Sequence, residues 1–133
     1  MNDSEWQAIS TALRGDASPE LALAAVASLQ ANATASDVPR LLNLLEDSSF
    51  FVREAAAWPL SDLGRVDVLP QLLEAYQRGL DEGHDNDGFS AALIDLVEMN
   101  SAAAVPQLQK LVETGSAAAR ENAAWLLTFC KGK

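Results

Sequence analysis

A chain of 133 residues with 49% hydrophobic residues has the length of one domain and enough apolar side chains to form a core. Aromatic residues make up only 6% of it, and most apolar side chains are Ala and Leu, which favour helices over strands. The net charge of −10 argues against unaided binding to DNA, RNA or an anionic membrane, because each requires a basic surface. An acidic surface would attract a basic partner, but it would equally serve solubility alone.

The single cysteine, Cys130, excludes an internal disulfide and fits a reducing compartment. The first residues lack the basic segment and the apolar core of a signal peptide, and no apolar run reaches the length of a membrane span. We therefore expect a cytoplasmic protein.

In chain order, the hydrophobic spacing and the helix-start signals predict four pairs of helices within one domain. The predicted helices cover residues 4–14 and 18–31, 37–47 and 50–64, 67–80 and 88–100, and 102–114 and 116–131. In the first pair Trp6, Ile9 and Leu13 follow helical spacing, and Ser18-Pro19 marks the start of the second helix. The corresponding repeats run over about 4–31, 37–64, 67–100 and 102–131.

Two of these pairs are copies of one another at an offset of 67 residues without a gap. Val38-Pro39 aligns with Val105-Pro106, Arg53-Glu54 with Arg120-Glu121, and Trp58 with Trp125. A third copy begins at Val68-Leu69-Pro70. Pro39, Pro70 and Pro106 each stand near the start of a helix, where the missing N–H costs nothing, so we assign them a structural role.

The motif Val52-Arg53-x-x-Ala56-Ala57-x-x-Leu60-x-x-Leu63-Gly64 resembles the second helix of a HEAT repeat. The segment Asp37-Val38-Pro39-x-Leu41-Leu42-x-Leu44-Leu45 resembles its first helix. The resemblance implies an all-α fold, a short right-handed α-solenoid of about four HEAT-like helical hairpins. It also implies protein recognition on a concave face lined by second helices, and a structural role for Arg53 and Arg120 in bonding turn carbonyls or acids of a neighbouring repeat. Pro59 departs from the pattern and predicts a kink, and the third pair lacks the Val-Arg start.

Helical geometry places a tryptophan in the middle of a polar stripe in two of the predicted second helices. Glu54, Trp58 and Ser61 lie opposite the apolar side of one helix, and Glu121, Trp125 and Thr128 lie opposite the apolar side of the other. An exposed Trp commonly anchors a protein partner, whereas a buried Trp packs against the neighbouring repeat. Both explanations stay open, and the first makes Trp58, Trp125, Glu54 and Glu121 candidate partner-binding residues.

The third pair is predicted to contain a long polar turn from Arg78 to Gly88. Its carboxylates Asp81, Glu82, Asp85 and Asp87 belong to a stretch without Lys or Arg between Arg78 and Lys110, which favours contact with a cationic partner. Asp85-Asn86-Asp87-Gly88 resembles the middle of a calcium-binding loop, but Ile94 stands where that loop requires a bidentate Glu, so we predict no metal site. Asp87 could instead cap the helix that follows.

No catalytic motif accompanies the single histidine, His84, and the single cysteine, and we predict no catalytic residue and no cofactor. We predict a non-enzymatic protein-binding module that uses the concave second-helix face and the acidic turn. Its expected partner is another protein, basic in character, and the chain is expected to be a monomer or a weak dimer. A narrower hypothesis is an immunity or inhibitor protein that neutralises a basic toxin. The alternatives are an accessory enzyme or lyase-like factor that binds a small molecule, and an assembly scaffold.

Overall fold

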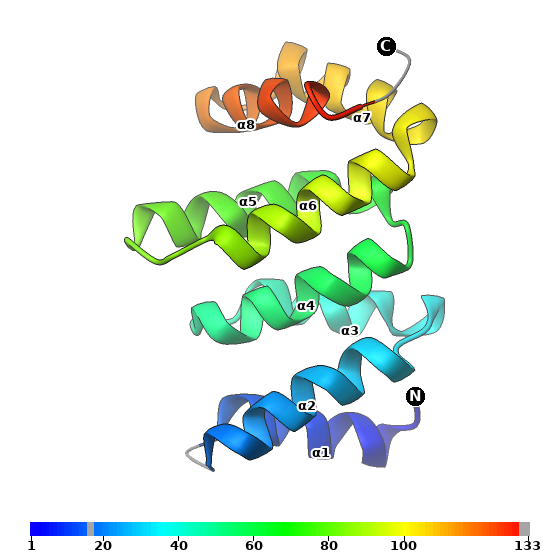
Figure 1. Ribbon diagram of the computed structural model, residues 1–133, viewed down its shortest axis with the longest axis vertical. Coiled ribbons are helices and arrows are strands. Elements are labelled where there is room, and N and C mark those ends of the chain that lie inside the picture. The colour runs from blue at the N-terminus through cyan, green and yellow to red at the C-terminus, as the bar shows by residue number, and fades with distance from the viewer. Residues whose placement is uncertain (16–17, 131–133) are drawn as a thin grey trace. The chain divides into compact units, whose positions relative to one another are not determined.

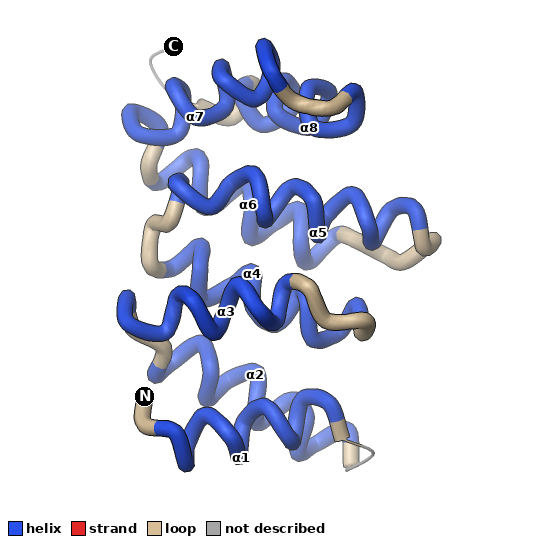
Figure 2. The backbone as a smooth tube through the Cα atoms, turned by 180° about the vertical axis from the view of Figure 1, so that it is seen from behind, coloured by secondary structure: helices blue, strands red, loops and turns tan. Residues whose placement is uncertain are grey.

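The computed structural model describes residues 1–15 and 18–130, and within these ranges eight α-helices and no strands form four helical hairpins (Figure 1, Figure 2). The all-α class and the four pairs of helices are therefore confirmed. Residue contacts gather into two compact units, Met1–Leu63 and Gly64–Lys133, and each contains two hairpins. That the two units form one domain stays a prediction.

The N-terminal unit contains the hairpins α1–α2 and α3–α4. Its elements are α1 (Asp3–Arg14), α2 (Pro19–Asn32), the short 3-10 helix η1 (Ala35–Asp37), α3 (Val38–Leu45) and α4 (Phe50–Asp62). The Asn2 side chain caps α1 by accepting a hydrogen bond from the Glu5 N–H at 2.8 Å, and Ser18 caps α2 through the Leu21 N–H at 3.3 Å. These caps satisfy backbone donors that a helix start otherwise leaves unpaired.

Helix α4 lies at the centre of the N-terminal unit, since it contacts α1, α2 and α3. Its Val52 and Leu60 are fully buried, as are Leu29 of α2 and Leu41 of α3. The helix continues through Pro59 to Asp62, so the proline does not interrupt it. A helix packed on three neighbours is buried over most of its circumference, which leaves little of α4 available to a partner.

The C-terminal unit contains the hairpins α5–α6 and α7–α8. Its elements are the 3-10 helix η2 (Val66–Val68), α5 (Leu69–Asp81), α6 (Asp87–Met99), α7 (Ser101–Thr114) and α8 (Ala117–Leu127). Leu69, Phe89, Leu96, Leu108 and Leu126 are fully buried and make up much of its core. No single described helix is long and apolar enough to cross a membrane, and the pair α6 and α7 passes such a test only jointly, with a bend of 117° between them.

Several predicted boundaries shift in the structure. The turn expected from Arg78 to Gly88 is confined to residues 82–86, because α5 continues to Asp81 and α6 begins at Asp87. Pro39 and Pro70 occupy the first turns of α3 and α5, whereas Pro106 lies inside α7. Helix α7 begins earlier than its proline indicates, because the alanines after Ser101 favour helix and the Asn100 carbonyl accepts the N–H groups of Ala103 and Ala104.

Candidate functional site

Helix α4 presents one narrow stripe of accessible side chains. Phe51 is 36% exposed, Glu54 and Trp58 are half-buried, and Asp62 is exposed. Their spacing of three, four and four residues places them on one face of the helix. The other residues from Val52 to Ser61 are buried, including Ser61 itself, which is 8% exposed. The prediction that Ser61 belongs to the accessible stripe is therefore wrong, because α4 packs against three helices and not against one face alone.

Helix α2 contributes a second row of accessible side chains beside this stripe. Glu20, Leu23, Ala27 and Gln30 are exposed and follow helical spacing, and Leu23 is 63% exposed. Gln30 Nε2 donates a hydrogen bond to Asp62 Oδ2 at 2.9 Å, which places the C-terminal ends of α2 and α4 next to each other. The two helices run in the same direction (Figure 1), so the earlier turns of α2 lie beside the earlier turns of α4.

We call the two rows together the α2–α4 surface. It comprises Glu20, Leu23, Ala27 and Gln30 of α2 and Phe51, Glu54, Trp58 and Asp62 of α4. Helical spacing in the sequence indicates Trp58 and Glu54 but not Leu23. Apolar residues occur on every side of α2, so their spacing does not reveal which of them face the core.

The signature arginine of α4 is part of the fold. Arg53 is fully buried, and its Nη1 donates to the carbonyl oxygens of Asp47 at 3.0 Å and Ser48 at 3.1 Å. Its guanidinium lies 5.7 Å from the ring centroid of Phe50. The side chain thereby joins α4 to the turn that precedes it, and carbonyl groups in that turn receive charge-assisted hydrogen bonds.

Asp47 organises the same turn from its other side. Its carboxylate accepts hydrogen bonds from Arg14 Nε at 2.6 Å and from the Ser49 N–H at 2.9 Å. Burial raises the pKa of Asp47, but the Ser49 and Arg14 hydrogen bonds and the nearby positive charges outweigh it, so the net pKa lies below the ordinary value. Arg14 belongs to α1, so this ion pair also links the first hairpin to the second.

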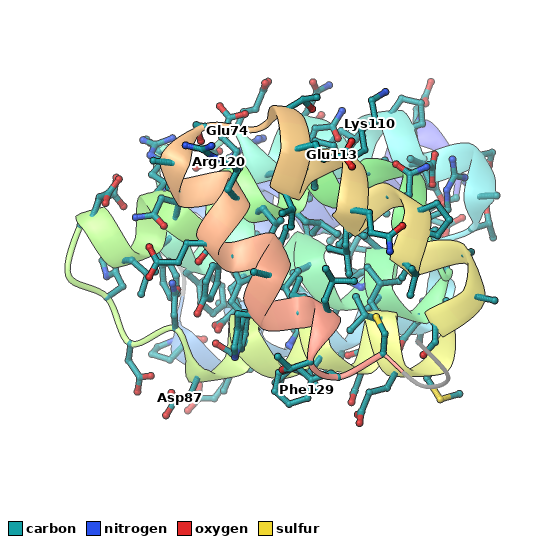
Figure 3. The ribbon with its side chains drawn as sticks, turned by 90° about the horizontal axis from the view of Figure 1, so that it is seen from above. Glu74, Asp87, Lys110, Glu113, Arg120 and Phe129 are labelled. Carbon is teal, nitrogen blue, oxygen red and sulfur yellow. The ribbon has the colours of Figure 1, made fainter. Side chains whose placement is uncertain are left out.

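Arg120 has the same signature position in α8 but a different environment. It is exposed, and among the contacts of residues 18–130 it has no counterpart of the bonds that Arg53 makes to turn carbonyls. Thr114 replaces Asp47 and Ala117 replaces Phe50 at the offset of 67, so neither the acidic side chain nor the covering ring is present. Figure 3 shows Arg120 on α8 at the edge of the C-terminal unit. The bonding to turn carbonyls expected of both arginines is thus seen for Arg53, whereas a structural role for Arg120 stays a prediction.

Trp125 packs within the C-terminal unit. Its ring lies 5.7 Å from that of Tyr76 with an angle of 11° between the planes, and 5.6 Å from that of Phe129 in an edge-to-face arrangement. Tyr76 belongs to α5, so this stack connects α8 to the neighbouring hairpin, and Trp125 stays half-buried. Glu121, one turn earlier, is exposed. Of the two explanations open for Trp125, packing against a neighbouring repeat has direct geometric support.

The acidic turn is exposed, but local bonds engage much of its charge. Asp81 accepts a hydrogen bond from Gln77 at 2.9 Å. Glu82 lies 3.0 Å from Arg78 Nε and 3.4 Å from His84 Nε2. Such contacts on a solvated turn leave carboxylates accessible to a partner, although each reduces the charge that the partner meets.

The start of α6 differs from the expected cap. Asp87 is the first residue of the helix, and Asn86 holds the position before it. Asn86 is buried, and its Nδ2 donates to the Tyr76 carbonyl at 2.9 Å. Asp85 Oδ1 accepts the Asp87 N–H at 3.0 Å. Asp87 therefore does not cap α6, although its charge in the first turn suits the helix dipole. In the described residues no group of three or more His, Cys, Asp or Glu is placed to hold a metal ion.

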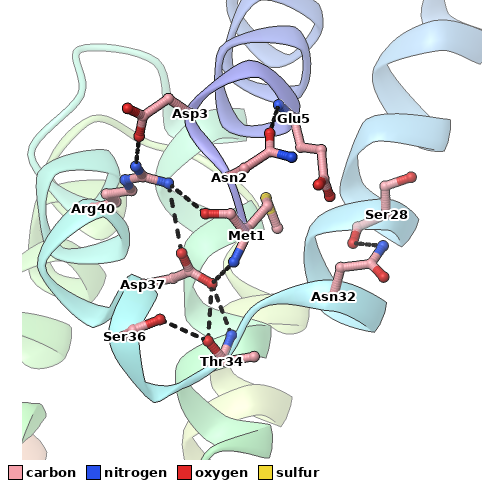
Figure 4. A network of polar contacts seen from close by, with 10 residues as sticks. All are labelled: Met1, Asn2, Asp3, Glu5, Ser28, Asn32, Thr34, Ser36, Asp37 and Arg40. Carbon is pink, nitrogen blue, oxygen red and sulfur yellow. Dashed lines mark hydrogen bonds and ion pairs between the residues drawn. The ribbon is translucent and has the colours of Figure 1, made fainter.

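A buried carboxylate at the start of α3 holds a polar network in the N-terminal unit (Figure 4). Asp37 is 2% exposed, and its Oδ2 accepts hydrogen bonds from the Thr34 N–H at 2.9 Å and the Met1 ammonium at 3.4 Å. Arg40 lies 3.6 Å from the other oxygen and also pairs with Asp3. Burial raises the pKa of Asp37, but the Thr34 and ammonium contacts outweigh it and leave the net pKa lowered.

Cysteine and histidine, which can form a nucleophile–base pair, lie in unlike places. Cys130 is buried, and its Sγ lies 3.8 Å from the Leu126 carbonyl oxygen that it follows by one turn. His84 is exposed in the acidic turn beside Glu82. Neither contact is that of a nucleophile with its base, which would require a Cys–His hydrogen bond.

Comparison with known proteins adds the family. A family model described as HEAT repeats matches residues 7–84, which is more than half of the chain. Searches of curated proteins and of solved structures found no match. HEAT repeats generally mediate protein–protein interaction, and proteins of this family are typically non-enzymatic scaffolds. On the family match and the four helical hairpins, this chain belongs to the HEAT-repeat family.

Proposed function

We propose that this protein is a non-enzymatic module that binds a basic partner protein. The observation that carries the proposal is the accessible stripe of α4, where two aromatic side chains alternate with two carboxylates and almost everything else is buried. Aromatic side chains are enriched among residues that dominate binding energy, and flanking carboxylates favour a cationic partner. The aromatic residues are Phe51 and Trp58.

The charge distribution of the N-terminal unit supports a basic partner. Residues 1–63 include nine Asp or Glu and three Arg, a formal net charge of −6. All three arginines are engaged inside the unit: Arg14 with Asp47, Arg40 with Asp3 and Asp37, and Arg53 with its turn. Approach of a positively charged surface would therefore meet few opposing cations, and it would be favoured at low ionic strength.

The acidic turn, with Asp81, Glu82, Asp85 and Asp87, is proposed as a second contact surface in the C-terminal unit. All four carboxylates are exposed. A narrower form of the proposal is an inhibitor of a basic toxin, acting in the cytoplasm, for which the small size and the net charge of −10 are suitable. Exposed charges act mainly on association rate and selectivity, so this turn is assigned to steering the partner.

The test is capture of partners from the native cell lysate by the tagged protein, at low and at high salt, with identification by mass spectrometry. We expect one basic protein in near-equal amount, with less recovered at high salt because rim charges are screened. A variant with Asp81→Asn, Glu82→Gln, Asp85→Asn and Asp87→Asn should recover less of it at low salt. Capture of no protein, with a small molecule retained instead, would contradict the proposal and favour the accessory-enzyme alternative. Recovery of only the chain itself would contradict it in favour of an assembly scaffold.

A further inference from the structure

We infer that the α2–α4 surface is the docking site for one basic amphipathic helix of the partner. This inference rests on the proposed function and deepens it, because it assigns both a site and a recognition chemistry. It uses Leu23 and Ala27, which nothing in the chain's repeat signature indicates, together with Phe51 and Trp58.

The surface has an apolar part that four side chains of α2 and α4 form. Leu23 is 63% exposed and Phe51 36%, while Ala27 is exposed and Trp58 half-buried. The Gln30–Asp62 hydrogen bond sets the register between the two helices. Counting back one turn from it places Ala27 near Trp58, and a further turn places Leu23 near the level of Glu54. Each of the two neighbouring rows thereby offers two apolar side chains to a partner, Leu23 and Ala27 from α2 and Phe51 and Trp58 from α4.

The backbone of the surface determines how a partner can be recognised. Both rows lie on continuous α-helices whose inner N–H and C=O groups are already paired, so a strand cannot be added to them. A helix with apolar residues at i, i+3, i+4 and i+7 presents side chains once per turn, which is the same repeat as the two rows. The side chains therefore favour a helical segment over an extended one.

The negative charge of the α2–α4 surface indicates that the partner helix carries a positive charge. Its ionisable side chains are Glu20, Glu54 and Asp62. Helix α2 contains no Lys, Arg or His, and the single such residue of α4 is the fully buried Arg53. A partner helix edged by Lys or Arg would therefore meet carboxylates and no exposed cation. A second copy of this chain, at a net charge of −10, and an anionic membrane are both disfavoured by the same charges.

Helix α2 also offers a matched control. Leu21 is 57% exposed, close to the 63% of Leu23, but two residues along a helix it points about 200° away from Leu23. The row that contains Leu23 also contains Gln30, which bonds to α4, so Leu21 faces away from that helix. The same substitution at the two leucines therefore changes the same side chain at similar exposure, inside and outside the proposed site.

The probe is a fluorescein-labelled helical peptide of about 18 residues, roughly five turns, with Leu on one face and Lys on the other. Fluorescence anisotropy with the full chain measures its dissociation constant. We expect Leu23→Ser and Trp58→Ala each to weaken binding about tenfold, and Leu21→Ser to change it less than about twofold. A peptide of the same pattern with Glu in place of Lys should bind at least about tenfold more weakly than the Lys peptide. Thermal unfolding of each variant checks that it remains folded.

Equal effects of Leu23→Ser and Leu21→Ser would overturn the site, and equal binding of the Lys and Glu peptides would overturn the assigned charge. Concentration-dependent dimerisation that Leu23→Ser abolishes would make a second copy the occupant and would also overturn the inference. Failure of this docking site can be distinguished from failure of the proposed function. A basic protein captured from lysate by wild type and Leu23→Ser alike would keep the proposed function and reject this docking site.

Discussion

The hairpins α3–α4 and α7–α8 share a gapless sequence match at an offset of 67, yet the signature arginines of the two hairpins differ in burial and hydrogen bonding. Arg53 is fully buried and bonded to two turn carbonyls, whereas Arg120 is exposed. The differences lie at or just after the end of the first helix of each hairpin and at the first residue of the second helix. In α3–α4 Asp47 shapes the turn and Phe50 covers the guanidinium, and in α7–α8 Thr114 and Ala117 replace them. A repeat signature therefore specifies a helix, while one residue of the preceding turn and the first residue of the helix decide whether its arginine is buried and bonded.

The two tryptophans extend this comparison. Trp58 shares an accessible stripe with Phe51, whereas Trp125 stacks on Tyr76 and contacts Phe129. The two tryptophans therefore have different roles at equivalent positions of the repeat. Trp58 is proposed as a partner contact, and Trp125 is mainly a packing residue. Substitutions at the paired positions can break or sharpen this contrast.

The largest expected difference concerns the arginines. Arg53→Ala removes two charge-assisted hydrogen bonds and leaves the Asp47 and Ser48 carbonyls without that donor, so we expect it to lower the free energy of unfolding by about 3 kcal/mol. Arg120→Ala removes an exposed side chain and should change it by less than about 0.5 kcal/mol. Urea unfolding followed by circular dichroism measures both. Equal losses for the two variants would refute the contrast drawn between the hairpins.

The next difference concerns the tryptophans. Trp125→Ala removes the stack on Tyr76 and the edge contact with Phe129, and we expect a loss of about 2–3 kcal/mol. Trp58→Ala should cost less stability, about 1–2 kcal/mol, and should show its main effect in partner binding. The same unfolding experiment compares them. A greater loss of stability for Trp58→Ala would reverse the two assignments.

A smaller effect is expected at the turn itself. Asp47→Ala removes the bond to the Ser49 N–H and the ion pair with the half-exposed Arg14, and we expect a loss of about 1 kcal/mol. Thr114→Ala is the matched control at the offset of 67. Thr114 is exposed and its hydroxyl donates to the Lys110 carbonyl in the last turn of α7, so the change should stay within about 0.5 kcal/mol.

The smallest effect is a pH dependence. The pKa of Asp47 is lower in the folded protein than its ordinary value, so the ionised form stabilises the fold. This contribution is fully present above about pH 4 and is lost as the pH falls through the lowered folded pKa. We expect Asp47→Asn to show a smaller loss of stability than wild type when unfolding is measured from pH 6 down to about pH 2. An unchanged pH profile would show that another carboxylate, such as the buried Asp37, dominates the acid response.

Much of the helical architecture could be predicted from local sequence. Ser18 and Ser116 cap α2 and α8, and the prolines in the first turns of α3 and α5 mark their starts. These signals depend on neighbouring residues in the chain, and helix starts followed them closely. The short helices η1 and η2 were not predicted. In η1 the Thr34–Asp37 contacts form a capping box, and that network also includes Arg40 and the Met1 ammonium, which come from elsewhere in the unit.

The candidate site was predictable only in part. Helical spacing indicates Glu54 and Trp58, because the two residues lie one turn apart on the side of the predicted helix opposite its apolar face. It could not indicate that Ser61 is buried or that Leu23 is 63% exposed. Both depend on how many helices surround α4 and α2, and periodicity within one segment contains no such information.

The most direct test of the proposed function compares partner capture by wild type and by Trp58→Ala, at equal concentrations of folded protein. We expect wild type to recover a basic protein in near-equal amount, and Trp58→Ala to recover clearly less of it, because loss of an anchor side chain commonly costs more than about 1.4 kcal/mol of binding, about a tenfold rise in the dissociation constant. Equal recovery by the two proteins, or recovery of no protein by wild type, would contradict the account.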